Sequence, residues 1–248
     1  AKQSLAEWKD KLTLVHSSFA NIEEVLMKVG VSAVDGIIMD LGLSSDQLDS
    51  EERGFSFMRD ALPDMRMDLS KGVSAAEWLE ETPKEEMSRV FKVYGEERMA
   101  WKIAKAIERS QVDGPIKSTE VLAEIISKAK GGRRGKIHPA TKVFQAIRIA
   151  VNDEMGHLER GLDQSFNCLS KGGRLGVITF HSLEDRMVKH KIREHEGRME
   201  SLHEGGERWE GKEPRMMRIT RKPILATEEE VKMNPRSRSA KLRVAEKI

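Results

Sequence analysis

The chain has very little cysteine, and that scarcity excludes two kinds of site. Its 248 residues include one cysteine, Cys168. An intramolecular disulfide framework and a zinc site built from several cysteines are therefore excluded. A lone thiol suits a reducing cytoplasm, which we expect as the location. No apolar run approaches the ~18 residues of a membrane span, and no signal-peptide pattern opens the chain, so no membrane partner is expected.

A large excess of charge of one sign is also missing. The 43 basic and 41 acidic residues nearly cancel, so the overall charge does not indicate a nucleic-acid partner. Their distribution is less even: residues 128–148 hold seven Lys or Arg and no acid, and residues 232–248 hold six against one. Such segments can form phosphate-contacting surfaces, although an ordinary solvated face is the commoner explanation.

An apolar run followed by a long polar loop is the most informative stretch of the sequence. Val34–Met39 predicts a buried strand, with a buried helix segment as the alternative, and the run ends at Asp40. In open α/β sheets ligands bind just outside the carboxyl ends of the strands, which makes Asp40 a candidate site residue. The alternative is a structural Asp40 that caps loop amides. The loop that follows carries carboxylates, arginines and two phenylalanines, and such loops are usually functional when aromatic residues argue against disorder.

Strand and helix patterns alternate along the chain. Lys11–His16 predicts a strand, a helix follows up to Gly30, and the strand that ends at Asp40 comes next. A later helix carries an apolar stripe and is predicted to end at Gly172-Gly173, before a strand at Arg174–Phe180. This alternation is typical of a parallel sheet, so we expect an α/β fold.

The region after the polar loop lacks strand patterns. Residues 70–140 contain helical spacings throughout, which predicts an all-helical insertion between two strands of the sheet. We therefore expect an α/β domain built from residues 1–69 and 141–248, interrupted by a helical domain at 70–140.

Several motifs resemble those of one enzyme family. DLGLSSDQLD at Asp40, RGFSF at Arg53 and DMRMD at Asp64 are similar, in this order and spacing, to the signature of bacterial ribosomal RNA cytosine-N4 methyltransferases of the RsmH (MraW) type. Further similar motifs are YGEE at Tyr94, HPAT at His138, FQAIR at Phe144, VN at Val151, FHSLEDR at Phe180, NPR at Asn234 and RSAKLR at Arg238. The resemblance covers essentially the whole chain.

The resemblance implies both a fold and an activity. The fold would be a class I (Rossmann-like) methyltransferase sheet, with the helical domain recognising substrate. The methyl donor would be S-adenosylmethionine, and no metal would be required. The acceptor would be the N4 amine of a cytosine in small-subunit ribosomal RNA or a ribosomal particle. That base must be unstacked to react, so a loop or an opened helix is the expected target.

Two residues at predicted strand ends are candidates for the chemistry. Asp40 and His181 follow parallel strands, whose carboxyl ends converge on one crevice. The lone pair of a cytosine N4 amine is delocalised into the ring, so an enzyme must rotate and align that amine. A carboxylate acceptor such as Asp40 suits the task. His181 is either catalytic or the cap of the next helix, and the sequence leaves both alternatives open.

The resemblance also implies three cofactor contacts. Phe19 would stack near the adenine, Asp40 would contact the methionine or ribose end, and Gln47 would hydrogen-bond the cofactor. From the residues alone, Phe19 is equally a core residue and Gln47 equally a solvent-facing one.

Three groups of residues are candidates for RNA contacts, because guanidinium groups stack on bases and bind phosphates. The loop after Asp40 supplies Arg59, Asp64 and Arg66, the basic loop supplies Arg133, Arg134 and Lys136, and the tail supplies Arg236, Arg238 and Lys241. For the tail residues the resemblance implies an alternative, which is that they stabilise the last strand.

The sequence departs from the family in its cofactor cradle. The family begins with a strand, a glycine-rich turn and a second strand ending in an acid, and nothing before Lys11 supplies them. The first strands of the sheet would then be missing, so we expect this chain to be the remainder of a longer one. The rival hypothesis is a non-catalytic RNA-binding or ribosome-assembly protein that has lost its cradle. A third is another nucleotide-binding α/β enzyme.

Overall fold

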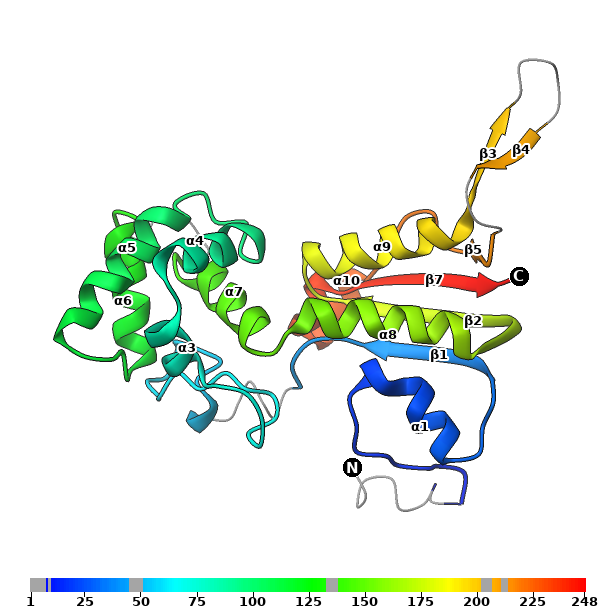
Figure 1. Ribbon diagram of the computed structural model, residues 1–248, viewed down its shortest axis with the longest axis horizontal. Helices are drawn as coiled ribbons and strands as arrows, with labels where there is room; N and C mark the ends of the chain where they lie inside the picture. Colours follow the sequence, from blue (N-terminus) through cyan, green and yellow to red (C-terminus); the bar gives the residue numbers. More distant parts are fainter. Residues whose placement is uncertain (1–7, 9, 45–50, 133–137, 202–206, 211–213) are drawn as a thin grey trace. The chain divides into compact units, whose positions relative to one another are not determined.

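The computed structural model describes the chain in several ranges, which are residues 8, 10–44, 51–132, 138–201, 207–210 and 214–248. The chain divides into two compact units (Figure 1). Unit 1 consists of Ala1–Gly42 and Met155–Ile248, and unit 2 consists of Leu43–Glu154. Helices long and apolar enough to cross a membrane are absent from the ranges that the structure describes.

Unit 1 is built on a mixed β-sheet. Its strands are β1 (Val34–Asp40), β2 (Leu169–Thr179), β5 (Met216–Arg218), β6 (Ile224–Leu225) and β7 (Lys241–Lys247). The order is β1-β2-β7-β5, with β6 also paired to β7; β1 and β2 are parallel, and the remaining pairs are antiparallel. A separate two-stranded sheet joins β3 (Arg198–Ser201) and β4 (Glu207–Glu210). The expected α/β class is confirmed, but the sheet is mixed, whereas the alternation of strands and helices predicted a parallel one.

One predicted strand of unit 1 is wrong. Residues 12–16 adopt no regular secondary structure, and Leu12, Leu14 and Val15 are all between 42% and 47% exposed. The segment has the composition of a strand, but no described strand lies beside it to accept its hydrogen bonds. A strand is stable only with paired neighbours, so composition alone is insufficient.

Three helices cover one face of the sheet of unit 1. They are α1 (Ile22–Lys28), α8 (Glu154–Cys168) and α9 (Ser182–Glu196), and they share an apolar core with Ile37, Met39, Leu175 and Val177. The alternate residues of a strand point to the opposite face. There Ile38 is 81% exposed, so β1 buries one face and leaves the other open.

The long helix predicted before Gly172-Gly173 differs in two ways from the structure. It is divided into α7 (Thr141–Val151) and α8, with a break at Asn152 and Asp153, whose φ is 46°. It then ends at Cys168, and the two glycines lie inside β2, where the register to β1 shifts. A Cβ on Gly173 would lie 2.8 Å from the Ser170 carbonyl oxygen, so the close backbone approach there requires glycine.

Unit 2 is helical. Its helices are α3 (Ala75–Glu81), α4 (Lys84–Val93), α5 (Ala100–Ser110), α6 (Thr119–Ala129) and α7. Fully buried apolar side chains form one core, including Leu79, Phe91, Ile103, Ile107, Leu122, Ile126 and Ile147. The unit also contains the loop segment before residue 70 and the whole of α7, so its limits are wider than the predicted 70–140. The roles assigned to the two domains stay predictions.

Short elements complete the chain. The 3-10 helices are η2 (Phe19–Asn21), η3 (Glu51–Arg53), η4 (Gln111–Asp113) and η5 (Pro235–Ser239), and α10 covers Glu228–Met233. Ser74 begins α3 with a reciprocal cap: its hydroxyl accepts the Glu77 N–H, and the Glu77 carboxylate accepts the Ser74 N–H. This cap fixes the point where the polar loop enters the helical core.

Candidate functional site

The carboxyl ends of β1 and β2 meet at one edge of the sheet in unit 1. Asp40 is in register with Ile178, and the Leu41 N–H donates to the Ile178 carbonyl at 3.1 Å. Asp40 is exposed, unlike its neighbour Met39, which is 5% exposed. The predicted position of Asp40, at a strand end beside a parallel strand, is confirmed, and its carboxylate is open to solvent.

The chain turns tightly directly after this carboxylate. Gly42 has a φ of 91°, and a Cβ at that position would lie 3.4 Å from Cδ2 of Phe180. L-residues rarely adopt such a φ, so the turn depends on glycine. The Phe180 ring thus supports the backbone that follows Asp40.

His181 has the geometry of a helix cap. It begins α9, its Nδ1 accepts the Glu184 N–H at 3.4 Å, and its Nε2 lies 3.1 Å from the Glu184 carboxylate. The same carboxylate accepts the N–H groups of Phe180 and His181, at 2.8 and 3.3 Å. These contacts support the capping alternative for His181, and its catalytic role stays a prediction.

The tail candidates lie on two elements, Lys241 on β7 and Arg236 and Arg238 on η5. The Lys241 ammonium lies 3.8 Å from the Asp185 carboxylate, which also accepts two hydrogen bonds from the Arg243 guanidinium at 2.7 and 3.1 Å. This cluster ties α9 to β7, so Lys241 contributes to the scaffold. Arg236 and Arg238 lie exposed on η5.

Phe19 lies against α8 and is 40% exposed. A Cβ on Gly161 would be 2.6 Å from Cδ2 of Phe19, so this glycine makes room for the ring. The ring also meets His157 edge-on at 6.5 Å, and Ser18 Oγ lies 2.9 Å from His157 Nδ1. Phe19 is therefore a held but half-open aromatic surface. The other cofactor candidate of the resemblance, Gln47, lies outside the described residues.

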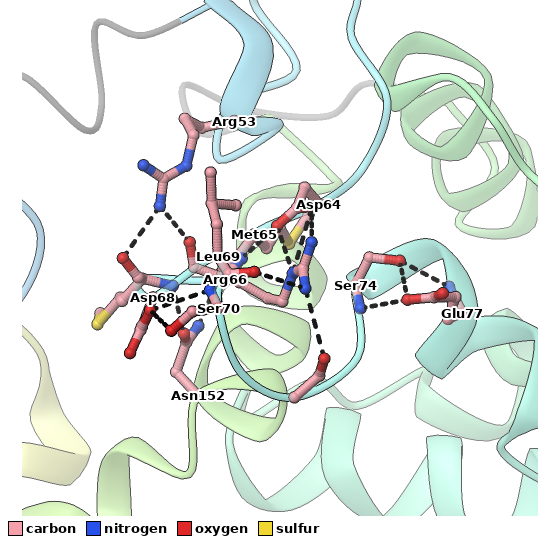
Figure 2. Close-up of polar contacts among 12 residues, drawn as sticks. Arg53, Asp64, Met65, Arg66, Asp68, Leu69, Ser70, Ser74, Glu77 and Asn152 are labelled. Carbon is pink, nitrogen blue, oxygen red and sulfur yellow. Dashed lines mark hydrogen bonds and ion pairs between the residues drawn. The ribbon is translucent and has the colours of Figure 1, made fainter.

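In unit 2 the loop candidates Asp64 and Arg66 bind each other (Figure 2). Arg66 donates to both carboxylate oxygens of Asp64, at 3.0 Å from Nε to Oδ1 and 2.8 Å from Nη2 to Oδ2. Its Nη1 donates to the carbonyls of Leu69 and Gly72 at 3.2 and 3.4 Å. Burial alone would raise the pKa of Asp64, but the hydrogen bonds and charge of Arg66 together hold that pKa below its ordinary value.

Two further side chains hold the backbone of this loop, as Figure 2 shows. The Asn152 amide donates to the Met65 carbonyl at 2.7 Å and accepts the Met67 N–H at 2.6 Å. The Arg53 guanidinium donates to the carbonyls of Arg66 and Met67. Met65 has a φ of 59°, unusual for a long side chain, and is 1% exposed. Such a conformation persists only when its surroundings determine it, so the loop is held rigidly.

The glycine of the RGFSF motif is required by backbone packing. Gly54 has a φ of 64°, and a Cβ there would lie 2.3 Å from the Leu62 carbonyl oxygen and 2.9 Å from the Asp64 nitrogen. Both partners are main-chain atoms, which cannot rotate away. The motif therefore reflects a close crossing of two segments of the loop.

The remaining loop candidate and the loop aromatics pack on unit 2. Arg59 is exposed, and its carbonyl accepts the Thr119 hydroxyl at 3.1 Å. The Phe57 ring lies between those of His138 and Phe144, with centroid distances of 4.4 and 5.0 Å. The expectation that the aromatics oppose disorder therefore has a packing basis.

Sequence reasoning gave no role to a buried ion pair in unit 2. Lys130 Nζ lies 2.6 Å from the Glu97 carboxylate and donates to the Pro139 carbonyl at 3.0 Å. Burial alone would raise the pKa of Glu97, but Lys130 and the Met99 N–H together hold it low. The hydrogen bond from Lys130 to Pro139 joins the two ends of a segment that contains the basic candidates. These candidates, Arg133, Arg134 and Lys136, lie outside the described residues. No local pattern in the sequence indicated the ion pair, since 33 residues separate its partners.

Comparison with known proteins identifies the family. The model of the MraW methylase family matches residues 1–248. A protein of Geobacter sp. (strain M21) named ribosomal RNA small subunit methyltransferase H is 47% identical over 250 residues, which are 100% of this chain and 80% of the relative. One of the same name from Acinetobacter baumannii (strain AYE) is 47% identical over 99% of this chain and 78% of the relative. The resemblance found in the motifs is thereby confirmed, and the chain belongs to the MraW methylase family.

Proposed function

We propose that this chain transfers a methyl group from S-adenosylmethionine to the N4 amine of a cytosine in small-subunit ribosomal RNA. The supporting observation is the family match over residues 1–248, together with relatives named for methylation of that RNA. S-adenosylmethionine is the methyl donor of this family. The rival hypothesis of a non-catalytic RNA-binding protein is not favoured by these relatives.

The described residues of unit 1 fit part of the methyl donor. The exposed Asp40 carboxylate, beside the Gly42 turn, suits the end of the donor that carries positive charge. The half-open ring of Phe19 offers an apolar surface for a planar base. A glycine-rich turn that precedes β1 between two strands is not found in the ranges that the structure describes. Of the contacts to the donor, we therefore assign to these residues only those at its two ends.

Asp40 is the residue to which we assign a chemical role. Its carboxylate would accept a hydrogen bond from the cytosine N4 amine and so turn the nitrogen lone pair out of conjugation with the ring. Bound S-adenosylmethionine supplies the electrophilic methyl group. The new N–C bond would form as the sulfur–methyl bond of the donor breaks, with S-adenosylhomocysteine as the leaving group. The methylated amine would then be more acidic, and the exposed Asp40 carboxylate would take its proton and pass it to water. His181 acts as a positioning residue that fixes the start of α9 at the same edge.

Unit 2 would recognise the RNA. Because the hydrogen-bond donors of Arg66 hold Asp64, Leu69 and Gly72, we assign Arg66 a contact through the plane of its guanidinium, which can stack on a base. Asp64 then orients that plane, and Arg59 is the exposed cation of the same loop. A rigid loop loses little conformational freedom on binding, which favours specific recognition.

The basic segments would contact phosphates in the same RNA. They include Arg133, Arg134 and Lys136 in one segment, and Arg236 and Arg238 on η5. Each phosphate contact contributes to affinity and to its salt dependence without reading sequence. In this proposal unit 1 corresponds to the methyltransferase sheet and unit 2 to the substrate-recognition insertion.

A transfer assay tests the proposal. The chain is incubated with S-adenosylmethionine and small-subunit RNA from cells that lack this methylation, and the RNA is digested to nucleosides. We expect N4-methylcytidine, identified by mass and chromatographic retention. RNA from cells that already carry the modification is the control and should accept little methyl. Tight RNA binding without any methylated nucleoside would instead favour the non-catalytic rival.

A further inference from the structure

A solvent-facing stripe of α5 gathers cations around a tryptophan. We define the α5 stripe as Arg98, Trp101, Lys102, Lys105 and Arg109. Their spacings of three and four residues place them on one side of α5 and of the turn before it. Trp101 is 46% exposed, and the Lys105 ammonium lies 5.8 Å from its ring centroid. The opposite side of α5 is closed, since Ile103 and Ile107 are fully buried.

The cations of this stripe differ from those on the neighbouring helices. On α4 and α6, three basic side chains are held by acidic partners, in the pairs Lys84–Glu108, Arg89–Glu86 and Lys128–Glu124. Ion pairs of Arg98, Lys102 or Arg109 are absent from the part of the chain that the structure describes. Glu108 is the one acid between residues 98 and 109, and Lys84 already holds it at 2.9 Å. The stripe therefore keeps its positive charge for a partner.

We propose that the α5 stripe binds the phosphate backbone of single-stranded ribosomal RNA, with an unpaired base stacked on Trp101. This inference rests on the proposed function for the identity of the RNA. Lys102 and Arg109 are separated by about 10 Å along the helix axis, so the stripe spans more than one phosphate of a strand. An exposed aromatic ring among cations is the combination with which proteins hold single strands without reading sequence.

The stripe fits RNA better than an anionic membrane surface. A helix that lies on a membrane presents a broad apolar face to the lipid. The apolar face of α5 packs in the core of unit 2, where Ile103, Ala104 and Ile107 are fully buried. What remains for a partner is one aromatic ring and a row of point charges, which match a chain of bases and phosphates.

Two variants with one charge-matched control test the inference. The stripe variant carries Lys102→Gln, Lys105→Gln and Arg109→Gln. The control carries Lys84→Gln, Arg89→Gln and Lys128→Gln, which remove the same charge from paired cations of the same unit. Affinity for a small-subunit RNA fragment with unpaired bases is measured over a series of salt concentrations. We expect the stripe variant to reduce the slope of log affinity against log salt by up to about 2, at roughly 0.7 per contact, and the control to change it little.

The second variant isolates stacking. Trp101→Leu keeps an apolar side chain and should weaken binding to the unpaired fragment about tenfold, with little effect on a fully paired duplex of the same length. If the stripe and control variants changed the slope of log affinity against log salt equally, at unchanged thermal stability, the effect would come from net charge alone. That result would overturn the inference. The inference would also be overturned if the stripe variant lost binding to anionic phospholipid vesicles but still bound RNA as the unaltered chain does. These outcomes are separate from failure of the proposed function, which would appear as wild-type RNA binding without methyl transfer.

Discussion

In unit 2 the Asp64 carboxylate is 13% exposed and held by Arg66, whereas in unit 1 Asp40 lies exposed at the end of β1. Both belong to motifs of the same family. The loop around Asp64 uses its polar groups to fix its own backbone, and the strand edge at Asp40 leaves a carboxylate open to solvent. Membership in a family motif therefore does not show whether a residue has a structural or a chemical role. The partners of each side chain make that distinction.

The largest expected effect tests how strictly the loop of unit 2 is fixed. Gly54→Ala would place a Cβ 2.3 Å from the Leu62 carbonyl oxygen at a φ of 64°, so it combines a main-chain clash with a strained conformation. We expect the free energy of unfolding to fall by about 3 kcal/mol or more. Urea denaturation followed by circular dichroism measures this loss.

Gly72→Ala is the matched control for that prediction. Gly72 has a φ of 67° in the same loop, but a Cβ added there would have no neighbouring heavy atom within 4 Å. The substitution should cost about 1 kcal/mol from backbone strain alone. Equal losses at Gly54 and Gly72 would show that strain, and not the crossing of the two loop segments, explains the glycine of the motif.

The second prediction tests whether the exposed carboxylate of Asp40, at the strand edge of unit 1, takes part in methyl transfer. Asp40→Asn keeps the size of the side chain and removes the charged acceptor. We expect methyl transfer to fall by about 10²-fold or more with the unfolding midpoint unchanged, since Asp40 is exposed. Asp35→Asn, at another exposed position of β1, is the control and should keep full activity. Wild-type turnover in Asp40→Asn would remove Asp40 from the mechanism.

The third prediction concerns acid stability, which should distinguish the two units. The folded-state pKa values of Asp64 and Glu97 are held below their ordinary values of 3.8 and 4.5. The stabilisation is therefore fully present above those ordinary values and is lost as the pH falls through the lower folded-state values. Thermal melts between pH 6 and pH 3 should show unit 2 losing stability over the acidic end of that range.

Variants at the same carboxylates check the cause of that dependence. Asp64→Asn and Glu97→Gln should each lower stability at neutral pH, where the ion pairs with Arg66 and Lys130 are lost, and should flatten the dependence on acid. An unchanged acid dependence in both variants would assign it to other carboxylates of the chain.

The smallest expected effect decides between the two roles of His181. His181→Ala removes the side-chain cap of α9 and should cost about 1 kcal/mol, whereas His181→Asn, which can accept the same N–H, should restore most of it. If His181 only positions the helix, His181→Asn also keeps methyl transfer and its pH profile. If His181→Asn restored stability but not methyl transfer, His181 would be catalytic. The strand edge of unit 1 would then contain a second reactive residue beside Asp40.

Local patterns in the sequence determined much of the molecule. The apolar run Val34–Met39 predicted the strand β1, which also includes Asp40, and the helical spacings predicted the helices of unit 2. Both patterns are local, because burial of one face repeats every two residues in a strand and every three or four in a helix. The prediction failed where a local pattern needed a distant partner. Residues 12–16 have no neighbouring strand in the described ranges, and the predicted long helix is divided at Asn152, whose amide holds Met65 and Met67.

The use of each polar side chain was decided only by the tertiary structure. The sequence shows that Glu97, Lys130, Lys102 and Arg109 are charged, but not that the first two neutralise each other while the last two remain open. An ion pair between residues far apart in the sequence forms only where the fold brings them together. The spacing of residues along the chain does not show which ones these are. For the same reason the sequence left His181 between catalyst and cap, and the contacts with Glu184 support the cap. The sequence thus determined which groups are available, and folding determined which of them are already occupied.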